Sequence, residues 1–164
     1  IKTFQNVSIT IVGGGEQLED LKRLAKELKI DQKVHFTGMV EEQEMIKLLD
    51  KADIYVSTSK VDAGLAASTA EAMAMELPVI HTDNSDNREW VSEGNGGFLF
   101  EAGNNDDLLR CISKAMSEKQ NWQVYGKRNR SKIVKYYNYN IEMRKIEDIY
   151  NEATSKEPPP SGGN

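Results

Sequence analysis

An α/β fold, with a parallel sheet covered by helices on both faces, is predicted by three features of this sequence. Short β-branched runs, typical of buried strands, alternate with segments whose apolar residues recur at helical spacing. Glycine-rich or polar turns separate the two kinds of segment, for example at residues 13–15 and 94–97. At 164 residues, the chain has the size of one domain with a substantial core.

The first five elements are predicted from residue composition and from the spacing of apolar residues along the chain. Residues 7–12 (VSITIV) are mostly β-branched and end in Gly13, Gly14 and Gly15, which indicates a buried strand and a tight turn. Leucines at helical spacing, with charges on the opposite face, predict an amphipathic helix over residues 18–28. The next elements expected are a strand at 34–37, a helix over 45–52 and a strand at 53–57.

The second half of the chain continues the alternation. Small residues predict a thin helix over 68–75, which can approach a sheet or a ligand closely. The remaining elements expected are strands at 77–82 and 97–100 and helices over 105–118, 121–136 and 139–153. One domain is therefore expected over 1–153, cut at its N-terminal edge because the chain opens without Met. Residues 154–164, rich in proline and glycine, are expected to be a disordered tail or a cloning remnant.

Charge and composition argue against several classes of protein. Lysine and arginine number 21 against 26 aspartate and glutamate, a net charge of −5, so no general nucleic-acid or membrane surface is indicated. The sequence holds no run of about 18 apolar residues, which predicts that there is no transmembrane helix. The single cysteine, Cys111, lies in a helical apolar pattern and is expected to be a core thiol in a reducing cytosol.

Ligands of open parallel sheets bind outside the carboxyl ends of the strands, and this rule selects four loops here. They are residues 13–17, 38–41, 57–67 and 82–87. The glycines of the first loop either permit a tight turn only, or let the backbone approach a phosphate at a helix N-terminus. A dinucleotide fingerprint needs a third glycine where this chain has Leu18, which argues against the alternative of a nicotinamide-dependent oxidoreductase.

Residues 57–86 carry the strongest functional signal. Gly64, Leu65 and Ala66 lead into a helix whose first turn holds Ser68 and Thr69. Backbone N–H groups and two hydroxyls at such a helix start predict an anion site. Glu71 follows and has two interpretations. It lies at capping-box spacing from Ser68, where it would bond to the N-cap amide, or it is an acid that contacts a ligand.

The two histidines and the nearby acids allow further hypotheses. His35 alternates with apolar neighbours and is expected to be packed in its strand, whereas His81 ends a strand and is either a ligand contact or an ordinary strand residue. No group of His, Cys and carboxylates has metal-ligand spacing. Asp83-Asn-Ser-Asp86 lacks the Asp-x-Asp arrangement of metal-dependent transferases, and its acids are expected to cap a helix at 87–91. No metal is therefore predicted.

The stretch around Glu71 resembles the signature of family-4 glycosyltransferases with the two-domain GT-B fold. The family's usual pattern is Glu-Ala-Met-Ala, a small residue, Gly and Leu-Pro-Val, matched here by Glu71-Ala-Met-Ala74 and Leu77-Pro-Val79, and then by Thr82-Asp83. Further similar segments are 11–15, 34–38, 52–57 and 95–99. The resemblance spans about residues 5–153. It implies the C-terminal, Rossmann-like half of a retaining glycosyltransferase, without its first strand and helix.

The resemblance also implies roles for two acids. In that family two acids are separated by seven residues, and the second, here Glu71, binds the ribose hydroxyls of the nucleotide. The first touches the donor sugar, and its strict position holds Ala63. Either the loop is one residue longer and Asp62 takes that role, or the acid is missing. We expect Asp62 to take it.

Further contacts with the donor are implied by the same match. The sugar and diphosphate are assigned to Gly64, Leu65, Ala66, Ser68 and Thr69, with the turn of Gly13, Gly14 and Gly15 also facing the donor. The loop that holds the base matches Gly38, Met39 and Val40.

The resemblance finally implies the partners and the limits of this chain. The donor is a nucleoside diphosphate sugar, and no cofactor is expected. The glycan or lipid acceptor would bind an N-terminal domain outside the chain, as would the Arg and Lys that neutralise the diphosphate, so the fragment is expected to be inactive alone. A cytoplasmic protein is expected, or one at the cytoplasmic face of the membrane, with membrane association only through that other half and no nucleic-acid partner. The alternative is a non-catalytic module that binds a sugar nucleotide or phosphate.

Overall fold

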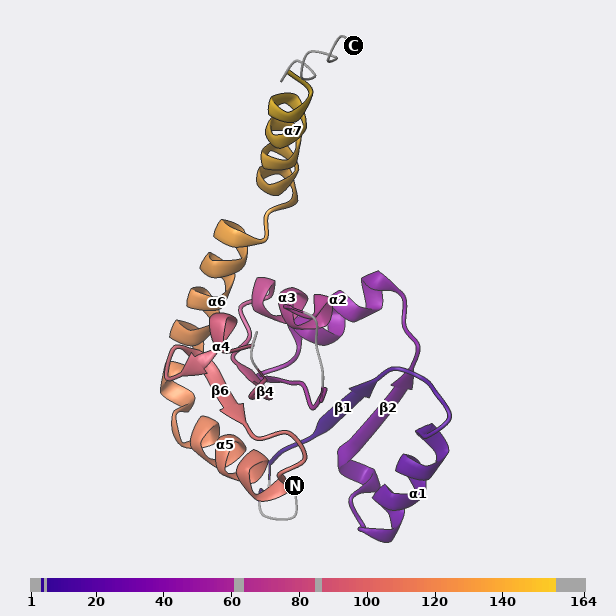
Figure 1. The fold of residues 1–164 in the computed structure, drawn as a ribbon. Helices are drawn as coiled ribbons and strands as arrows, with labels where there is room; N and C mark the ends of the chain where they lie inside the picture. Colours follow the sequence, from indigo (N-terminus) through magenta and orange to yellow (C-terminus); the bar gives the residue numbers. More distant parts are fainter. Residues whose placement is uncertain (1–3, 5, 61–63, 85–86, 156–164) are drawn as a thin grey trace, which may run out of the picture. The chain divides into compact units, whose positions relative to one another are not determined.

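The computed structural model describes residues 4, 6–60, 64–84 and 87–155, and the chain divides into two compact units. Unit 1 is Ile1–Asp50 and unit 2 is Lys51–Asn164 (Figure 1). Each unit has its own sheet, with strand order β1-β2 in unit 1 and β3-β4-β6-β5 in unit 2. The predicted alternation of strands and helices and the parallel pairing are confirmed. The described strands form two hydrogen-bonded sheets, where the sequence predicted one.

Unit 1 is a strand–helix–strand unit followed by a helix. β1 (Ile9–Val12) pairs in parallel with β2 (Val34–Gly38), and α1 (Leu18–Glu27) connects them through the short 3-10 turn η1 (Asp31–Lys33). The helix α2 (Glu42–Asp50) follows. A register shift lies between Ile11 and Val12, where β1 turns into the glycine loop.

Unit 2 contains the larger sheet and most of the helices. Its elements in chain order are β3 (Tyr55–Val56), α3 (Ala67–Ala74), β4 (Val79–Thr82), α4 (Asn87–Trp90), β5 (Ser92–Glu93), β6 (Gly96–Phe100), α5 (Asn105–Ser117), η2 (Lys119–Asn121), α6 (Trp122–Tyr136) and α7 (Tyr139–Ser155). β4 pairs in parallel with β3 and with β6. β5 was not expected from the sequence.

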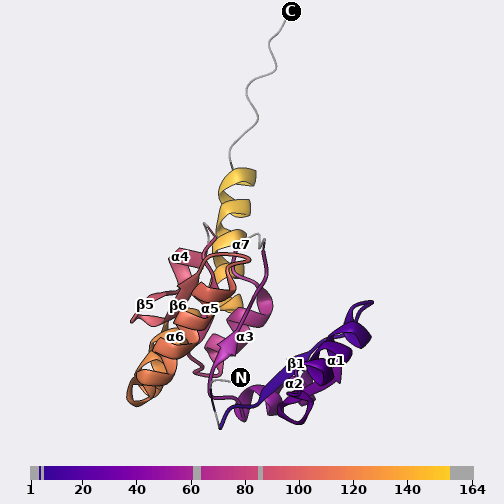
Figure 2. The ribbon, with the colours of Figure 1, turned by 90° about the horizontal axis from the view of Figure 1, so that it is seen from below.

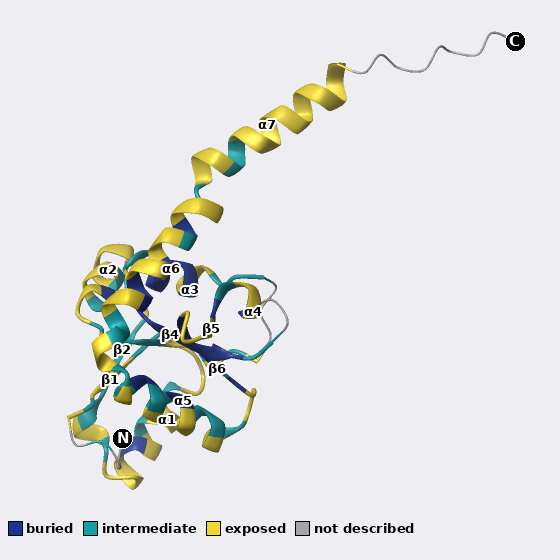
Figure 3. Ribbon diagram, turned by 90° about the vertical axis from the view of Figure 1, so that its left-hand side faces the viewer, coloured by how far each residue is buried: buried dark blue, intermediate teal, exposed yellow. Residues whose placement is uncertain are grey.

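The core of unit 2 lies on both faces of its sheet. Successive residues of β4 belong to different clusters, because side chains alternate across a strand. Ile80 packs with Phe98 and Cys111, whereas Val79 packs with Met73 and Ile133. Figure 2 shows α3, α5 and α6 gathered around β6, and Figure 3 shows β4 and β6 as the buried centre. The predicted covering of the sheet by helices on both faces is therefore confirmed for unit 2.

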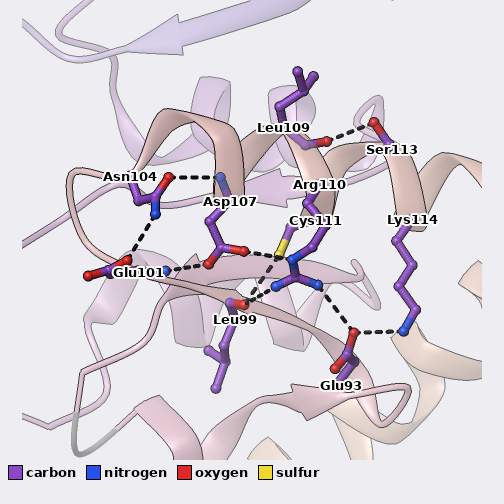
Figure 4. Close-up of polar contacts among 10 residues, drawn as sticks. All are labelled: Glu93, Leu99, Glu101, Asn104, Asp107, Leu109, Arg110, Cys111, Ser113 and Lys114. Atoms are coloured by element: carbon purple, nitrogen blue, oxygen red, sulfur yellow. Dashed lines mark hydrogen bonds and ion pairs between the residues drawn. The ribbon is translucent and has the colours of Figure 1, made fainter.

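The α5 helix is tied to β6 through the predicted core thiol. Cys111 is buried, and its Sγ donates to the carbonyl oxygen of Leu99 over 3.2 Å. Burial raises the pKa of this thiol above its ordinary value. Beside it, Arg110 Nε donates to Asp107 Oδ1 over 2.6 Å, and Lys114 Nζ donates to Glu93 Oε1 over 2.6 Å (Figure 4). The prediction for Cys111 is confirmed.

The α6 helix holds the turn that joins α3 to β4. Asn129 is buried, and its Nδ2 donates to the carbonyl oxygens of Leu77, over 2.7 Å, and Gly96, over 2.8 Å. A Cβ added to Gly126 would lie 1.8 Å from the carbonyl oxygen of Glu76. Glu76 itself has a φ of 61°, in the left-handed region. The backbone of α6 therefore touches the turn directly.

The last helix, α7, contains no buried residue among those described and leaves the α/β body of unit 2 (Figures 1 and 3). Tyr139, Ile149 and Tyr150 are all exposed on it. The helix ends at Ser155, two residues beyond the boundary expected from the sequence, and the rest of the predicted tail lies outside the described residues. None of the helices in the described ranges has both the length and the apolar character needed to cross a membrane.

Candidate functional site

In unit 1, the glycine turn and the loop after β2 lie side by side. The backbone N–H of Gly13 donates to the carbonyl oxygen of Gly38 over 2.9 Å, in an isolated antiparallel bridge. A Cβ added to Gly14 would lie 3.3 Å from Met39 Cγ. The structure thus brings together two segments that the sequence assigned to the donor.

The backbone of these loops requires glycine at three positions. Gly13, Gly15 and Gly38 have φ values of 127°, 139° and 69°, which L side chains rarely adopt. A Cβ added at any of the three would have no heavy atom within 4 Å. Tight turning alone accounts for these glycines, and the space around them is open, so both interpretations made from the sequence are compatible with the structure.

Met39 extends from this loop as an apolar side chain that is 82% exposed. Val40, next to it, is half-buried. A polarizable thioether exposed at the carboxyl end of a strand is suited to contact with the flat face of a ring.

In unit 2, α3 begins one residue earlier than expected, and this overturns the capping-box interpretation. The N-cap is Ala66, in an extended conformation and without a side-chain cap, so Ser68 lies inside the first turn. Glu71 therefore has no N-cap hydroxyl partner at the predicted spacing. Its side chain is exposed, and within the described part of the chain its carboxylate forms no hydrogen bond or ion pair.

The first turn of α3 carries two hydroxyls in different surroundings. Ser68 is exposed, and its Oγ accepts a hydrogen bond from Tyr55 Oη over 2.8 Å. Thr69 is fully buried, and its Oγ1 has no hydrogen-bond partner among the described residues. Gly64 precedes them with a φ of 82°, and a Cβ added to it would have no heavy atom of the described residues within 4 Å.

The other predicted contacts of this loop divide into described and undescribed residues. Leu65 is half-buried and packs against the core cluster of Met73 and Val79. Ala66 is half-buried at the N-cap. Asp62 and Ala63 lie outside the described residues, so the assignment of the first acid to Asp62 stays a prediction.

Polar side chains at the end of β4 and directly after it hold the turn into α4. His81 is fully buried, and its Nδ1 lies 2.7 Å from Asn87 Nδ2. Asp83 Oδ1 and Oδ2 accept from Arg88 Nε and Nη2 over 2.5 and 2.8 Å, and this pairing lowers the pKa of Asp83. Asp83 therefore pairs with a side chain instead of capping the helix, while Asp86 lies outside the described residues.

Two further observations concern metal binding and His35. In the described ranges, no group of three or more His, Cys, Asp and Glu side chains could hold a metal ion. The expectation that His35 is packed is wrong: it is exposed, because alternation along β2 turns it to the face opposite Val34 and Phe36.

Comparison with known protein families identifies the chain. Residues 1–138 match the profile of the glycosyl transferases group 1. The chain belongs to this family. The sequence-based resemblance to a glycosyltransferase is confirmed at this level, and the family membership covers the glycine turn of unit 1 and the α3 loop of unit 2.

Curated relatives of this group 1 glycosyltransferase are considerably longer. An uncharacterized glycosyltransferase of Methanocaldococcus jannaschii is 25% identical over 146 residues, which are 89% of this chain and 37% of that protein. The alpha-monoglucosyldiacylglycerol synthase of Streptococcus pneumoniae is 32% identical over 117 residues, 71% of this chain and 26% of that protein. The chain thus spans between a quarter and two fifths of the length of these relatives.

Solved structures share the fold. Anabaena HepE in complex with UDP superposes with a TM-score of 0.80 at 20% identity, over 89% of this chain and 41% of that one. Sucrose-phosphate synthase of Thermosynechococcus elongatus gives a TM-score of 0.80 at 18% identity, over 89% and 38%. At these identities the likeness concerns the fold. It agrees with the predicted half of a two-domain glycosyltransferase.

Tyr55 is a residue near the candidate site that the sequence did not single out. The available signal was a tyrosine inside the strand predicted at 53–57, two residues before the start of the loop chosen as ligand-binding. Its partner Ser68 is 13 residues away, and sequence spacing does not show that contact.

Proposed function

We propose that this chain is the donor-binding half of a retaining glycosyltransferase, which moves a hexosyl group from a nucleoside diphosphate to a glycan or lipid acceptor. Family membership supports the class of reaction. The observation that carries the proposal is Glu71, an exposed acid on α3 whose carboxylate forms no hydrogen bond in the described part of the chain. Such a carboxylate can accept hydrogen bonds from the two ribose hydroxyls of a nucleotide.

The start of α3 would hold the diphosphate. Helix N-termini present backbone N–H groups and a positive partial charge, and Ser68 adds an exposed hydroxyl. Gly64 has no side chain, and it would allow a phosphate or sugar to approach the backbone closely. Asp62 would contact the donor sugar, and Leu65 and Ala66 would contribute backbone groups.

The loops of unit 1 would contact the base. Gly38, Met39 and Val40 offer backbone amides and carbonyls beside an exposed thioether. The glycine turn next to them would allow the donor to approach the backbone. A solved neighbour, Anabaena HepE, was crystallised with UDP and with UDP-glucose, which supports a uridine nucleotide as the first candidate.

We further propose that the chemistry needs more than this chain. The departing diphosphate would itself assist the acceptor hydroxyl, because no candidate base stands out among the residues that the structure describes. The acceptor and the cations that neutralise the leaving group would come from sequence outside these residues, and the chain alone would not turn over. The reaction would take place in the cytoplasm.

The proposal is tested by replacing Glu71. In the full-length enzyme, Glu71→Ala is expected to weaken binding of the donor about tenfold to a hundredfold, as for loss of a charge-assisted hydrogen bond. Affinity is measured by calorimetry with UDP, GDP and ADP and their glucose conjugates. Glu147→Ala on α7, another exposed acid, serves as the control and is expected to bind normally. Unchanged affinity in Glu71→Ala contradicts the proposal.

A second variant separates an enzyme from a binding module. Asp62→Asn in the full-length protein is expected to abolish transfer of the sugar while the protein still binds UDP, GDP or ADP as the wild type does. A full-length protein that binds a nucleotide sugar but shows no transfer to glycan or lipid acceptors, even with Asp62 intact, would support the non-catalytic module instead.

A further inference from the structure

A hydrogen bond between two hydroxyl groups joins β3 to the first turn of α3. Tyr55 Oη and Ser68 Oγ are 2.8 Å apart. Both residues of this hydrogen bond belong to regular structure, Tyr55 to β3 and Ser68 to α3. The Tyr55 side chain packs against the core cluster of Met73 and Val79, and its backbone N–H donates to the carbonyl oxygen of Pro78 over 3.0 Å. The phenol is thus a rigid partner for a hydroxyl at the helix start.

Only one proton can lie between these two oxygens. The phenolic O–H of tyrosine is a stronger hydrogen-bond donor than an alkyl hydroxyl, because the ring stabilises negative charge on its oxygen. Tyr55 therefore donates and Ser68 accepts. The proton of Ser68 must then point elsewhere, and in the described part of the chain it reaches no protein acceptor.

The position of Ser68 makes an anion the matching acceptor for that proton. Ser68 is exposed in the first turn of α3, where backbone N–H groups attract negative charge. The neighbouring hydroxyl, on Thr69, is turned into the protein and buried. Ser68 is accordingly the hydroxyl of this turn that a diphosphate oxygen can reach from solvent.

We propose that Tyr55 is a positioning residue of the donor site, which orients the Ser68 hydroxyl so that its proton is donated to the diphosphate. The inference rests on the proposed function, because it needs a nucleoside diphosphate at the start of α3. A hydroxyl that already accepts one hydrogen bond becomes a stronger donor in the next. The tyrosine thus acts on the ligand through the serine and without touching it.

The test is a double-mutant cycle in the full-length enzyme, which includes the cations that are proposed to lie outside this chain. Wild type, Tyr55→Phe, Ser68→Ala and the double variant are each titrated with UDP, GDP and ADP and with uridine, guanosine and adenosine, followed by heteronuclear NMR. Phenylalanine keeps the ring packing and removes only the hydroxyl. For the diphosphate that binds, Tyr55→Phe is expected to weaken affinity about three- to tenfold, the size of one hydrogen bond. The affinity for the matching nucleoside is expected to stay unchanged.

The cycle distinguishes positioning from mere stability. If Tyr55 acts through Ser68, its substitution adds nothing in the Ser68→Ala background. The inference is overturned if Tyr55→Phe binds the diphosphate as wild type does, if it weakens the nucleoside equally, or if it weakens Ser68→Ala by the same factor as wild type. Tyr139→Phe, which removes an exposed hydroxyl on α7, is the matched control and should bind normally.

The two proposals fail in different ways. Wild type that binds none of the three diphosphates at millimolar concentration contradicts the donor site in this chain, and the role of Tyr55 with it. Wild type that binds one of them while Tyr55→Phe binds it equally well contradicts only the role of Tyr55.

Discussion

At the scale of single residues, the pairing of Asp83 with Arg88 allows a prediction about pH. The hydrogen bond from Arg88 lowers the pKa of Asp83 in the folded protein. A carboxyl group whose pKa is lowered by folding stabilises the folded protein at a pH above the pKa of the unfolded chain, about 3.9. This contribution is lost as the pH falls through the pKa of the folded protein. Arg88→Ala is therefore expected to raise the pKa of Asp83, as measured by NMR of the carboxyl carbon. Arg144→Ala on α7 should leave this pKa unchanged; an equal rise there would contradict the assignment.

Some residues could be predicted from local sequence and others could not. Cys111 was identified as a core thiol because its helical neighbours are apolar, and the structure buries it. Asn129 stands in a run of basic residues that is typical of a solvated helix face. Its amide is nevertheless buried between the carbonyl oxygens of Leu77 and Gly96, which are 52 and 33 residues away. Acceptors so distant in sequence leave no local pattern.

At the scale of elements, the contact between α6 and the α3–β4 turn predicts an unusual sign for a glycine substitution. In a helix interior, Gly to Ala normally stabilises by about 1 kcal/mol. At Gly126 the new Cβ would lie 1.8 Å from the carbonyl oxygen of Glu76, so α6 or the turn must move. Gly126→Ala is expected to lower the free energy of unfolding by about 1–3 kcal/mol, measured by urea unfolding. Ser131→Ala, exposed on the same helix, should stay within about 0.5 kcal/mol; a stabilised Gly126→Ala would refute the close contact.

The helices of the second half were predicted to within two residues, whereas the strands were less accurate. A helix is specified by its own period, so α5 and α6 lie where their apolar residues place them. A strand exists only over the residues that find a partner. β3 was expected at 53–57 but forms only at Tyr55–Val56, and β5 was missed because two residues carry no recognisable pattern. The start of α3 was displaced by one residue, and this changed the interpretation of Glu71.

At the scale of the whole chain, α7 is expected to be dispensable for folding. It contains no buried residue in the described structure, whereas Tyr137, just before it, packs edge-to-face on Trp90. A chain that ends at residue 138 is therefore expected to keep its free energy of unfolding to within about 1 kcal/mol, since surface changes away from packed contacts cost little. Urea unfolding and an unchanged NMR spectrum for the remaining residues would confirm this. A loss of more than about 2 kcal/mol would show that α7 packs on the body.

The order of elements along the chain could be predicted from the sequence, because each segment carries its own pattern. The resemblance to glycosyltransferases could also be identified from these segments. The candidate site could be predicted in part. The loops of Gly13 and Gly38 were both chosen as strand ends, and the structure joins them by a hydrogen bond. The division into two units could not be predicted, since it depends on which strands pair and no local pattern records that.

The left-handed backbone of Glu76 has a consequence for the stability of this protein. The usual family pattern has glycine directly before Leu-Pro-Val, and this chain has Glu76 there, with a φ of 61°. A residue with a Cβ pays about 1 kcal/mol for that conformation. Arg130 Nε lies 3.9 Å from the Glu76 carboxylate, an exposed ion pair that offsets little of this cost. Glu76 thus holds a strained backbone conformation directly after α3, and Glu76→Gly is expected to relieve that strain and raise the free energy of unfolding by up to about 1 kcal/mol, measured by urea unfolding.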